Sequence, residues 1–456
     1  MLQAELIRKY NVPGPRYTSY PTVPYWDKAP FTEAQWKEHV KKAFQVSNQK
    51  DGISLYLHLP YCESLCTFCA CNKRITKNHG VELPYIETLL QEWKLYLQLF
   101  EGEKPRIQEI HLGGGTPTFF SPEHLKQLIR SILETSEVTD TAEFSFEGHP
   151  KNTTKEHLEA LHEVGFTRVS FGIQDFDLKV QEIINRVQSF ESVKEVTDNA
   201  RAAGYTSVNY DLIYGLPFQT KESIVDTIEK VKLLKPDRIA YYSYAHVPWI
   251  GQTGQRRFTE ADLPADEEKR LLYELGKKML EEAGYIEIGM DHFALKEDSL
   301  YKATESKSLH RNFMGYAANY TQLMIGLGVS SISDSWTAFA QNHKKVEDYQ
   351  QAVAEGHIPI YRGHPLTEED LILRKHILDV MCHFETSWEK EEQQVGILFE
   401  AKERLTEMEK DGLLEIGETS LRVTDAGKAF VRNICMALDG RMLRAKPESR
   451  IFSQTV

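Results

Sequence analysis

Residues 56–76 read YLHLPYCESLCTFCACNKRIT and contain four of the six cysteines of the chain, Cys62, Cys66, Cys69 and Cys71. The first three follow a C-x3-C-x2-C spacing. Three thiolates at this spacing can each bind one corner of a cubane [4Fe–4S] cluster, which leaves the fourth iron without a protein ligand. An iron with an open position can bind a small molecule and drive chemistry on it.

Two other kinds of site use closely spaced cysteines. A disulfide is disfavoured because the chain shows no secretory features. A structural zinc site usually has paired C-x2-C arms, with a second pair or histidines well downstream. Here only Cys69 and Cys71 could supply a fourth zinc ligand, and their spacing is poor. An iron–sulfur centre is therefore the favoured interpretation.

The composition limits the classes of protein to which the chain can belong. It has 456 residues, which predicts two domains and an appendage, and 41% of them are hydrophobic. With 67 acidic and 54 basic residues, the formal net charge is −13. This charge argues against broad binding of nucleic acid or of an anionic membrane, but it leaves room for a local basic pocket.

No targeting signal is visible. The first residues, MLQAELIRKYNVPGPRY, have no apolar core and no cleavage site, so we expect no signal peptide. We find no run of about 18 apolar residues, so no membrane span is expected. Reduced cysteines without an export signal predict a cytoplasmic location.

From residue 53 onward, apolar β-type runs alternate with stretches of helical periodicity. Six strands, each followed by a helix, predict a parallel α/β sheet covered on both faces, and right-handed crossovers can curl such a sheet into all or part of a barrel. A glycine-rich run at 323–333 is expected to be a further buried strand and loop. The six runs are ISLYLHL (53–59), IQEIHLGG (107–114), AEFSFEG (142–148), TRVSFGIQ (167–174), TSVNYDLIYG (206–215) and RIAYYSYA (238–245).

Three regions follow from this pattern: an arm at 1–50, a barrel with an extension at 51–365, and a tail at 366–456. Four prolines between Pro13 and Pro24 favour an extended arm. The tail reads as helices and one short hairpin, which is typical of a small, mainly helical, winged-helix-like module. Such modules sometimes bind DNA, but these segments are acidic or neutral, so we expect the tail to serve in packing or as a lid.

Chemistry in a parallel α/β barrel lies where strands end and loops begin, and the cysteine cluster starts three residues past the first strand. Gly113, Gly114 and Gly115 end the second strand, where bare backbone lets a ligand approach closely. Glu147 ends the third strand. Asp211 lies inside a β-run, and an ionised carboxylate is seldom buried without a partner.

The cysteine spacing after a strand resembles that of the radical S-adenosylmethionine (SAM) enzymes. A narrower resemblance covers essentially the whole chain: it looks like a member of the oxygen-independent coproporphyrinogen III oxidases. Cys71 contributes to that likeness, and so do the segments GPRYTSYPT (14–22), GGGTPT (113–118), GIQDF (172–176), NRVQ (185–188), DLIYGLPFQT (211–220), YAHVP (244–248) and LHRNF (309–313).

The resemblance implies a partial (β/α)6-type radical SAM barrel that removes two propionate carboxyl groups from coproporphyrinogen III and leaves vinyl groups, giving protoporphyrinogen IX in haem biosynthesis. It implies a [4Fe–4S] cluster on Cys62, Cys66 and Cys69, and one or two molecules of SAM. The matching cofactor-binding positions are Tyr56, Phe68, Gly114, Gly115, Thr116, Glu147, Gln174, Arg186, Asp211, Ala245 and Ile332. Tyr56, His58 and Cys71 are expected to serve catalysis, although Cys71 is read almost as well as a small core residue.

The substrate that this resemblance implies is a tetracarboxylate, so an acidic chain needs local cations for it. Arg16, Arg74 and Arg311 are the candidates, and Lys73 is a further one. A flavodoxin or ferredoxin-type reductant is expected from the family, and the chain is expected to be a monomer. Two positions depart from the family pattern: Met314 replaces an amide, and His149 stands where a smaller polar residue is usual.

Two other functions share this barrel. One is a haem-binding chaperone, and the other is a haem-degrading radical SAM methyltransferase. The chaperones generally lack the tyrosine-rich arm and carry an aromatic residue at the position of Cys71. Both features of this chain favour the oxidase.

Overall fold

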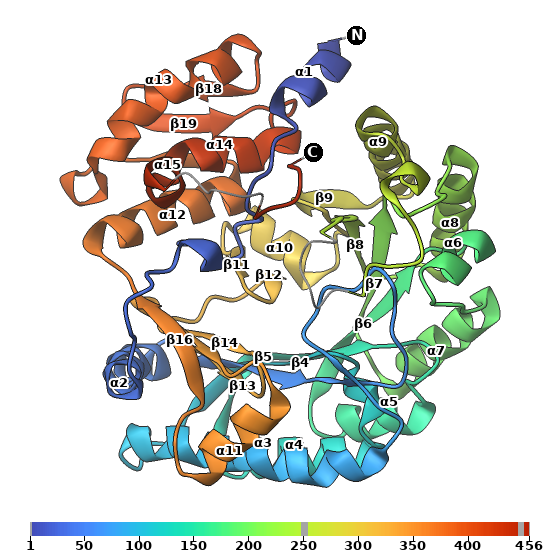
Figure 1. Cartoon of the computed structure of the whole chain (residues 1–456), viewed down its shortest axis with the longest axis vertical. Coiled ribbons are helices and arrows are strands. Elements are labelled where there is room, and N and C mark those ends of the chain that lie inside the picture. The colour runs from blue at the N-terminus through green and yellow to red at the C-terminus, as the bar shows by residue number, and fades with distance from the viewer. Residues whose placement is uncertain (1, 248–253, 446–450, 456) are drawn as a thin grey trace.

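A single large sheet organises the molecule in the computed structural model, which describes residues 2–247, 254–445 and 451–455. Within those residues the sheet has twelve strands in the order β16-β15-β14-β13-β1-β4-β5-β6-β7-β8-β10-β9. The end strands β16 and β9 do not pair, so the sheet curves without closing. Figure 1 shows helices along the outer side of this curve. The expected α/β partial barrel is confirmed.

The centre of the sheet is the six-stranded parallel unit that the sequence predicts. All five neighbouring pairs within it are parallel. The strands are rich in β-branched and aromatic residues and are buried on both faces, as is usual for parallel sheets. They are β1 (Ile53–Leu59), β4 (Arg106–Gly114), β5 (Glu137–Gly148), β6 (Phe166–Gln174), β7 (Ser207–Tyr214) and β8 (Arg238–Ser243).

Most of the crossover helices begin at polar caps, whereas the two that begin after Val81 and Ala265 have no side-chain cap. Ser121, Thr154, Ser189 and Thr220 each accept a hydrogen bond from a backbone N–H three residues on, which satisfies a donor that the helix itself leaves free. The crossover helices are α3 (Glu82–Leu97), α4 (Pro122–Leu133), α5 (Lys155–His162), α6 (Leu178–Ile183), α7 (Phe190–Ala203), α8 (Lys221–Leu234) and α9 (Asp266–Glu282).

Short strands extend the sheet at both edges. β13 (Met324–Leu327) pairs in parallel with β1, which confirms the strand expected within 323–333. The antiparallel strands β14 (Ile332–Asp334), β15 (Ala338–Asn342) and β16 (Ile360–Pro365) follow it, and β10 (His292–Ala294) and β9 (Ile286–Gly289) lie beyond β8. These edge strands have three to six residues each. Runs this short carry little periodicity, and the sequence alone did not indicate most of them.

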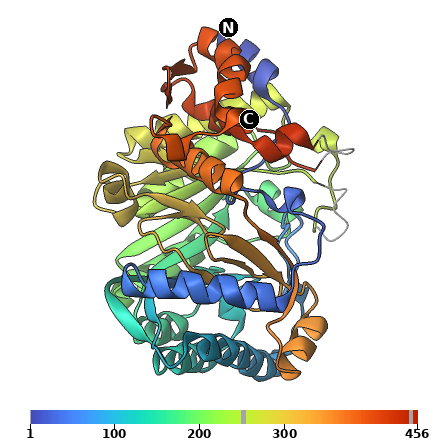
Figure 2. The ribbon, with the colours of Figure 1, turned by 90° about the vertical axis from the view of Figure 1, so that its left-hand side faces the viewer.

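The C-terminal segment forms its own apolar core and caps one end of the sheet (Figure 2). Three residues of the N-terminal arm, Ile7, Tyr17 and Tyr20, are buried in this same core. The arm is therefore packed with the C-terminal module. The module contains α12 (Glu368–His383), β17 (Glu385–Ser387), α13 (Gly396–Lys410), β18 (Leu414–Ile416), β19 (Ser420–Val423), α14 (Val431–Leu438) and α15 (Gly440–Arg444).

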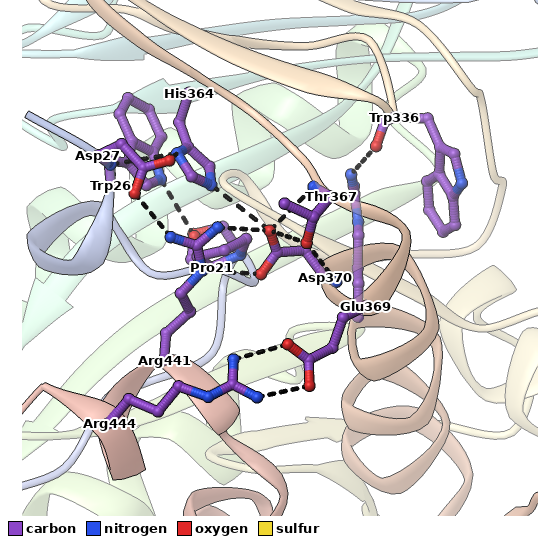
Figure 3. Close-up of polar contacts among 12 residues, drawn as sticks. Pro21, Trp26, Asp27, Trp336, His364, Thr367, Glu369, Asp370, Arg441 and Arg444 are labelled. Atoms are coloured by element: carbon purple, nitrogen blue, oxygen red, sulfur yellow. Dashed lines mark hydrogen bonds and ion pairs between the residues drawn. The ribbon is translucent and has the colours of Figure 1, made fainter. Parts of the chain in front are cut away.

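A buried polar network joins the arm, the sheet and the C-terminal module (Figure 3). Arg441 donates from Nε to Asp370 Oδ1 at 2.9 Å, from Nη2 to Asp370 Oδ2 at 2.7 Å, and from Nη1 to Asp27 Oδ1 at 2.7 Å. The Asp27 backbone N–H donates to His364 Nδ1 at 3.1 Å. We call Asp27, His364, Asp370 and Arg441 the interdomain network. Its four members come from four separate segments, so it fixes how those segments sit against one another.

Four helices and a hairpin remain outside the sheet and the module. They are α1 (Leu2–Tyr10), α2 (Glu33–Gln49), α10 (Ser299–Glu305), α11 (Val346–Ala354) and the hairpin of β11 (His310–Asn312) and β12 (Gly315–Ala317). In the described part of the chain, no helix is long and apolar enough to cross a membrane.

Candidate active site

The cysteine loop leaves the end of β1 and is held by two other segments. Thr67 N–H donates to Ile184 O at 2.9 Å, and Asn185 Nδ2 donates to Leu65 O at 2.7 Å. On another side, Gly254 N–H donates to Cys69 O at 3.0 Å. The two-residue strands β2 (Tyr61–Cys62) and β3 (Arg74–Ile75) pair and close the base of the loop. Polar backbone contacts thus fix the loop at both ends and in its middle.

The thiols within the loop have different surroundings. Thr116 Oγ1 donates to Cys62 Sγ at 3.4 Å, and Arg186 Nη1 donates to Cys66 Sγ at 3.6 Å. Burial raises the pKa of Cys62 to about 11. A hydrogen bond from Cys71 lowers the pKa of Cys69 to about 6, against the opposing effect of burial. Donors therefore face the sulfurs of the C-x3-C-x2-C motif and can stabilise their thiolate forms.

The three cysteines of the motif face one shared space. Cys62, Cys66 and Cys69 line one cavity together. In a cubane cluster each thiolate binds a different iron, so the sulfurs stand farther apart than around one zinc ion. The residues present fit the [4Fe–4S] cluster.

The glycine run at the end of β4 brings bare backbone against this loop. Gly114 has a φ of +119°, in the left-handed region that favours glycine. Gly115 N–H donates to Leu59 O at 2.8 Å, and a Cβ on Gly115 would stand 2.5 Å from Pro60 O. Thr116 N–H donates to Tyr61 O at 3.0 Å. Any larger side chain at Gly115 would push the start of the cysteine loop away from β4.

Charged and polar side chains at the ends of the next strands complete the cavity wall. Asp211 Oδ2 accepts from Ser170 Oγ at 2.9 Å, and Asp211 Oδ1 accepts from Asn209 Nδ2 at 2.9 Å. Burial raises the pKa of Asp211 to about 6, and the nearby Glu147 acts in the same direction. Arg186 donates from Nε and Nη2 to Gly172 O, at 3.1 and 2.6 Å. The cavity therefore presents both carboxylates and a guanidinium, which suits a zwitterionic ligand that also carries a cationic sulfur.

Tyr56 and His58 form a fixed pair on β1. His58 Nε2 lies 2.9 Å from Asn72 O, a carbonyl that can only accept, so Nε2 carries the proton. His58 Nδ1 therefore accepts from the Tyr56 hydroxyl at 3.0 Å. Burial lowers the pKa of His58 and raises that of Tyr56. The pair is neutral around pH 7 and points to a hydrogen-bonding role in catalysis or positioning.

The structure brings most of the sequence-predicted site residues to one place. Three others, Tyr56, His58 and Ile332, line an adjoining cavity that shares Cys71, Gly114 and Glu147 with the first. Ala245 lies in neither lining, and its carbonyl accepts from Gln255 Nε2 at 2.7 Å. The predicted residues that line the first cavity are Cys62, Cys66, Phe68, Cys69, Cys71, Gly114, Gly115, Thr116, Glu147, Gln174, Arg186 and Asp211.

The three substrate candidates lie in two different places. Arg74 forms an exposed ion pair with Glu347, outside the linings of both cavities. Arg16 and Arg311 lie together near the end of β8, where Arg311 Nη2 donates to Arg16 O at 3.2 Å. The assignment of Arg74 to the substrate stays a prediction, without support from its surroundings.

Sequence reasoning missed the polar interior of the barrel. A third cavity continues from Phe68 and Cys71 into the barrel, and its lining includes Glu109, Arg168 and Arg238. Each of these charged residues belongs to an otherwise apolar β-run. The same feature, a charge within a β-run, identified Asp211 as a candidate in the sequence. Applied to every strand, the same rule would have found them.

The two residues that depart from the family pattern, His149 and Met314, both line cavities. His149 Nδ1 accepts the Lys151 backbone N–H at 3.1 Å, and the ring lies in the cavity wall near Arg186. Burial lowers the pKa of His149 to about 2, so the ring is neutral. Met314 lies in the adjoining cavity with Ile332 and Tyr56. A thioether there offers no N–H donor, so a contact made by an amide in relatives is not available.

Comparisons with known proteins show the family to which the chain belongs. A family model described as the Radical SAM superfamily matches residues 56–231. The oxygen-independent coproporphyrinogen III oxidase of Helicobacter pylori strain J99 is 40% identical, with 99% of each chain covered. The protein of the same name from Escherichia coli K12 is 38% identical and covers 99% of this chain and 98% of its own.

One solved structure matches nearly the whole chain. It is described as coproporphyrinogen III oxidase from Escherichia coli, a radical SAM enzyme, and superposes with a TM-score of 0.87 at 36% identity. The match covers 96% of this chain and 98% of the other. The arm, the barrel and the C-terminal module are thus shared with that structure.

Proposed function

Because this chain belongs to the family of oxygen-independent coproporphyrinogen III oxidases, we propose roles for its own residues in that reaction. The chain is an oxidoreductase of haem biosynthesis. Without oxygen, it converts two propionate side chains of coproporphyrinogen III into vinyl groups and so yields protoporphyrinogen IX. The family names agree with this function and not with a haem chaperone or a haem-degrading methyltransferase.

The chain uses a [4Fe–4S] cluster and SAM, which when bound supply the radical chemistry. We assign the cluster to Cys62, Cys66 and Cys69. Their convergence on one cavity, beside the bare backbone of Gly114 and Gly115, is the observation that carries the assignment.

The cavity wall suits the cofactor's functional groups. Glu147 and the strand-end glycines present carboxylate and backbone groups, which we assign to the amino and carboxylate ends of SAM. Gln174, Arg186 and Asp211 lie across the same cavity and are assigned to its other polar groups or to a second molecule. Phe68 is assigned to the adenine, and Thr116, Ala245 and Ile332 to further cofactor contacts.

The remaining residues prepare the reaction space. Tyr56 and His58 hold a neutral hydrogen-bonded pair at the wall shared with Cys71, and we assign all three to catalysis or positioning beside the cofactor. The arm and the C-terminal module cover one end of the sheet, which helps to exclude water from a reaction that needs a dry site.

Three aspects of the reaction's setting are also proposals. We propose that a flavodoxin or ferredoxin-type protein supplies the electron, that the chain acts as a monomer, and that it works in the cytoplasm. The first is carried over from the family, and the last follows from the reduced cysteines of the site.

Anaerobic turnover tests the assignment directly. The reconstituted chain, given coproporphyrinogen III, SAM and a chemical reductant, should yield a product that has lost two carboxyl groups, as read by mass spectrometry. Cleavage of SAM without a vinyl product would contradict the function. The variants Cys62→Ser, Cys66→Ser and Cys69→Ser should each lose the cluster's visible absorption, while Cys382→Ser, a buried thiol of the C-terminal module, should keep it.

A further inference from the structure

Basic side chains from four parts of the chain gather beside the arm at the end of β8. Arg432 donates from Nε to Pro15 O at 2.8 Å, and Arg311 Nη2 donates to Arg16 O. Arg16 Nη2 donates to Ser243 O at 3.0 Å, and Lys269 Nζ donates to the next carbonyl along the chain, Tyr244 O, at 2.9 Å. We call Arg16, Lys269, Arg311 and Arg432 the basic group.

The negative charge facing this group is smaller than its positive charge. Asp291 Oδ2 lies 3.1 Å from Arg16 Nη1, and the exposed Asp266 acts on Lys269 at longer range. Arg311 and Arg432 are each only 5% exposed. Buried charges are normally paired, because removing them from water is costly. Among the described residues, four cations thus face two carboxylates, a balance that favours binding of a further anion.

Two members of the group also keep unused donors. Within the described residues, Arg311 Nε and Nη1 are buried without a hydrogen-bond partner. Within the same residues, the Lys269 ammonium, which has three N–H donors, donates one hydrogen bond, to Tyr244 O. Burial and the neighbouring Arg16 lower the pKa of Lys269 to about 8. An added carboxylate would satisfy these donors and offset the repulsion among the cations.

The basic group borders the polar interior of the barrel. The Arg16 guanidinium lies 6.0 Å from the ring centroid of Tyr242, and that of Arg311 lies 4.4 Å from the ring of Tyr316. Both tyrosines line the cavity that also contains Phe68 and Cys71. Phe68 and Cys71 follow β1, whereas Tyr242 belongs to β8, and four strands separate β1 from β8 in the sheet. The cluster loop and the basic group thus border the same barrel interior, and Gln255, which donates to both Phe68 O and Ala245 O, links the loop to the end of β8.

We propose that Arg16, Lys269 and Arg311 form a carboxylate subsite for a propionate that the reaction retains, while Arg432 holds the arm that carries Arg16. The proposal rests on the function given above. Coproporphyrinogen III has four propionates, of which two react beside the cofactor and two keep their charge throughout. A retained propionate held at the border of the barrel interior can anchor the macrocycle during each decarboxylation.

Binding of coproporphyrin III, the stable oxidised form of the substrate, tests the subsite in the full-length, cluster-loaded protein. Lys269→Met, Arg311→Met and Arg16→Gln should each weaken binding by about tenfold or more, because each removes a charge-assisted hydrogen bond. SAM affinity should stay within about twofold of wild type. Lys278→Met is the matched control: this exposed lysine lies on the same helix and faces only Glu282.

Two results would overturn the subsite. One is unchanged coproporphyrin III affinity in the folded variants. The other is an equal loss of SAM affinity, which would mean that the group only supports the fold. The Arg16 side chain is 30% exposed, whereas Arg311 is 5% exposed, so Arg16→Gln decides the matter if the other two fail to fold. If the variants keep their coproporphyrin III affinity and the wild type makes vinyl product, the subsite is refuted and the function stands. A wild type without vinyl product refutes the function.

Discussion

Gly115→Ala should damage both the fold and the site, because backbone surrounds this position. The added Cβ would lie 2.5 Å from Pro60 O, 2.7 Å from Pro60 C and 2.9 Å from Tyr61 O. Overpacking of this kind typically costs about 1–3 kcal/mol. For a barrel of about 300 residues, with an unfolding entropy of about 2.1 cal/mol/K per residue, that cost lowers Tm by roughly 2–5 °C.

The same shift reaches the cluster ligands. Tyr61 O accepts the Thr116 N–H, and Cys62 follows directly, so moving Pro60 and Tyr61 displaces Cys62. Displacements near 1 Å at a reacting centre can cost about 100-fold in rate. We expect Gly115→Ala to lose iron and sulfide after anaerobic reconstitution and to convert substrate about 100-fold more slowly.

Gly396→Ala is the control for this substitution. Gly396 opens α13 with no heavy atom within 4 Å of an added Cβ and no left-handed φ, so alanine there should leave Tm unchanged or slightly raised. Thermal unfolding followed by circular dichroism, with iron analysis on the same samples, measures both effects. A Gly115→Ala protein with wild-type Tm and a full cluster would refute the packing argument.

Three further predictions concern charge. Burial raises the pKa of Asp211 to about 6, above its unfolded value near 4, so keeping it ionised carries a stability cost that builds up between about pH 4 and pH 6. Asp211→Asn should therefore raise Tm most at pH 8, keep about half of that gain near pH 5 and lose it below about pH 4; a larger gain at pH 4 than at pH 8 would contradict this. His364 and Arg441 lower the pKa of Asp370 against the effect of burial, so the ionised Asp370 stabilises the fold fully above the unfolded pKa near 4, and this stabilisation is lost as pH falls. Asp370→Asn should therefore lower the free energy of unfolding by about 3–5 kcal/mol at pH 7, measured with denaturant, and by much less at low pH. His149 stays neutral because burial lowers its pKa to about 2. The SAM affinity of His149→Asn should therefore follow the wild-type pH profile between pH 5.5 and 8.5. A shifted midpoint of that profile, measured by calorimetry, would show that the ring titrates.

The central strands and the cysteine loop could be predicted because their signals are local. Each of the six strands is a run of apolar and β-branched residues followed by a helical period, and the C-x3-C-x2-C spacing lies within eight residues. The glycines after β4 indicate a close backbone approach for the same reason. Such features need no knowledge of distant segments.

The rest depends on contacts between distant residues. Asp27 and Arg441 meet across 414 positions of sequence, and Arg432 reaches Pro15 across 417. Nothing in a single sequence links an arm residue to a helix near the other terminus. The helix α6 (Leu178–Ile183) has too few residues for its period to stand out. The joining of arm and module into one core therefore emerges only from the structure.

The packing of the N-terminal arm against the C-terminal module has a consequence for the basic group. Residues 14–16 of the arm contact α14 through Arg432, the hairpin of β11 and β12 through Arg311, and the end of β8 through Arg16. A displacement of the C-terminal module would therefore move Arg16 relative to the barrel interior. An overall charge of −13 would repel a tetracarboxylate from most of the surface, and the basic group concentrates the opposite charge at one border of that interior. Charge separation of this kind favours orientations of the macrocycle that place a carboxylate beside the unused donors of Arg311.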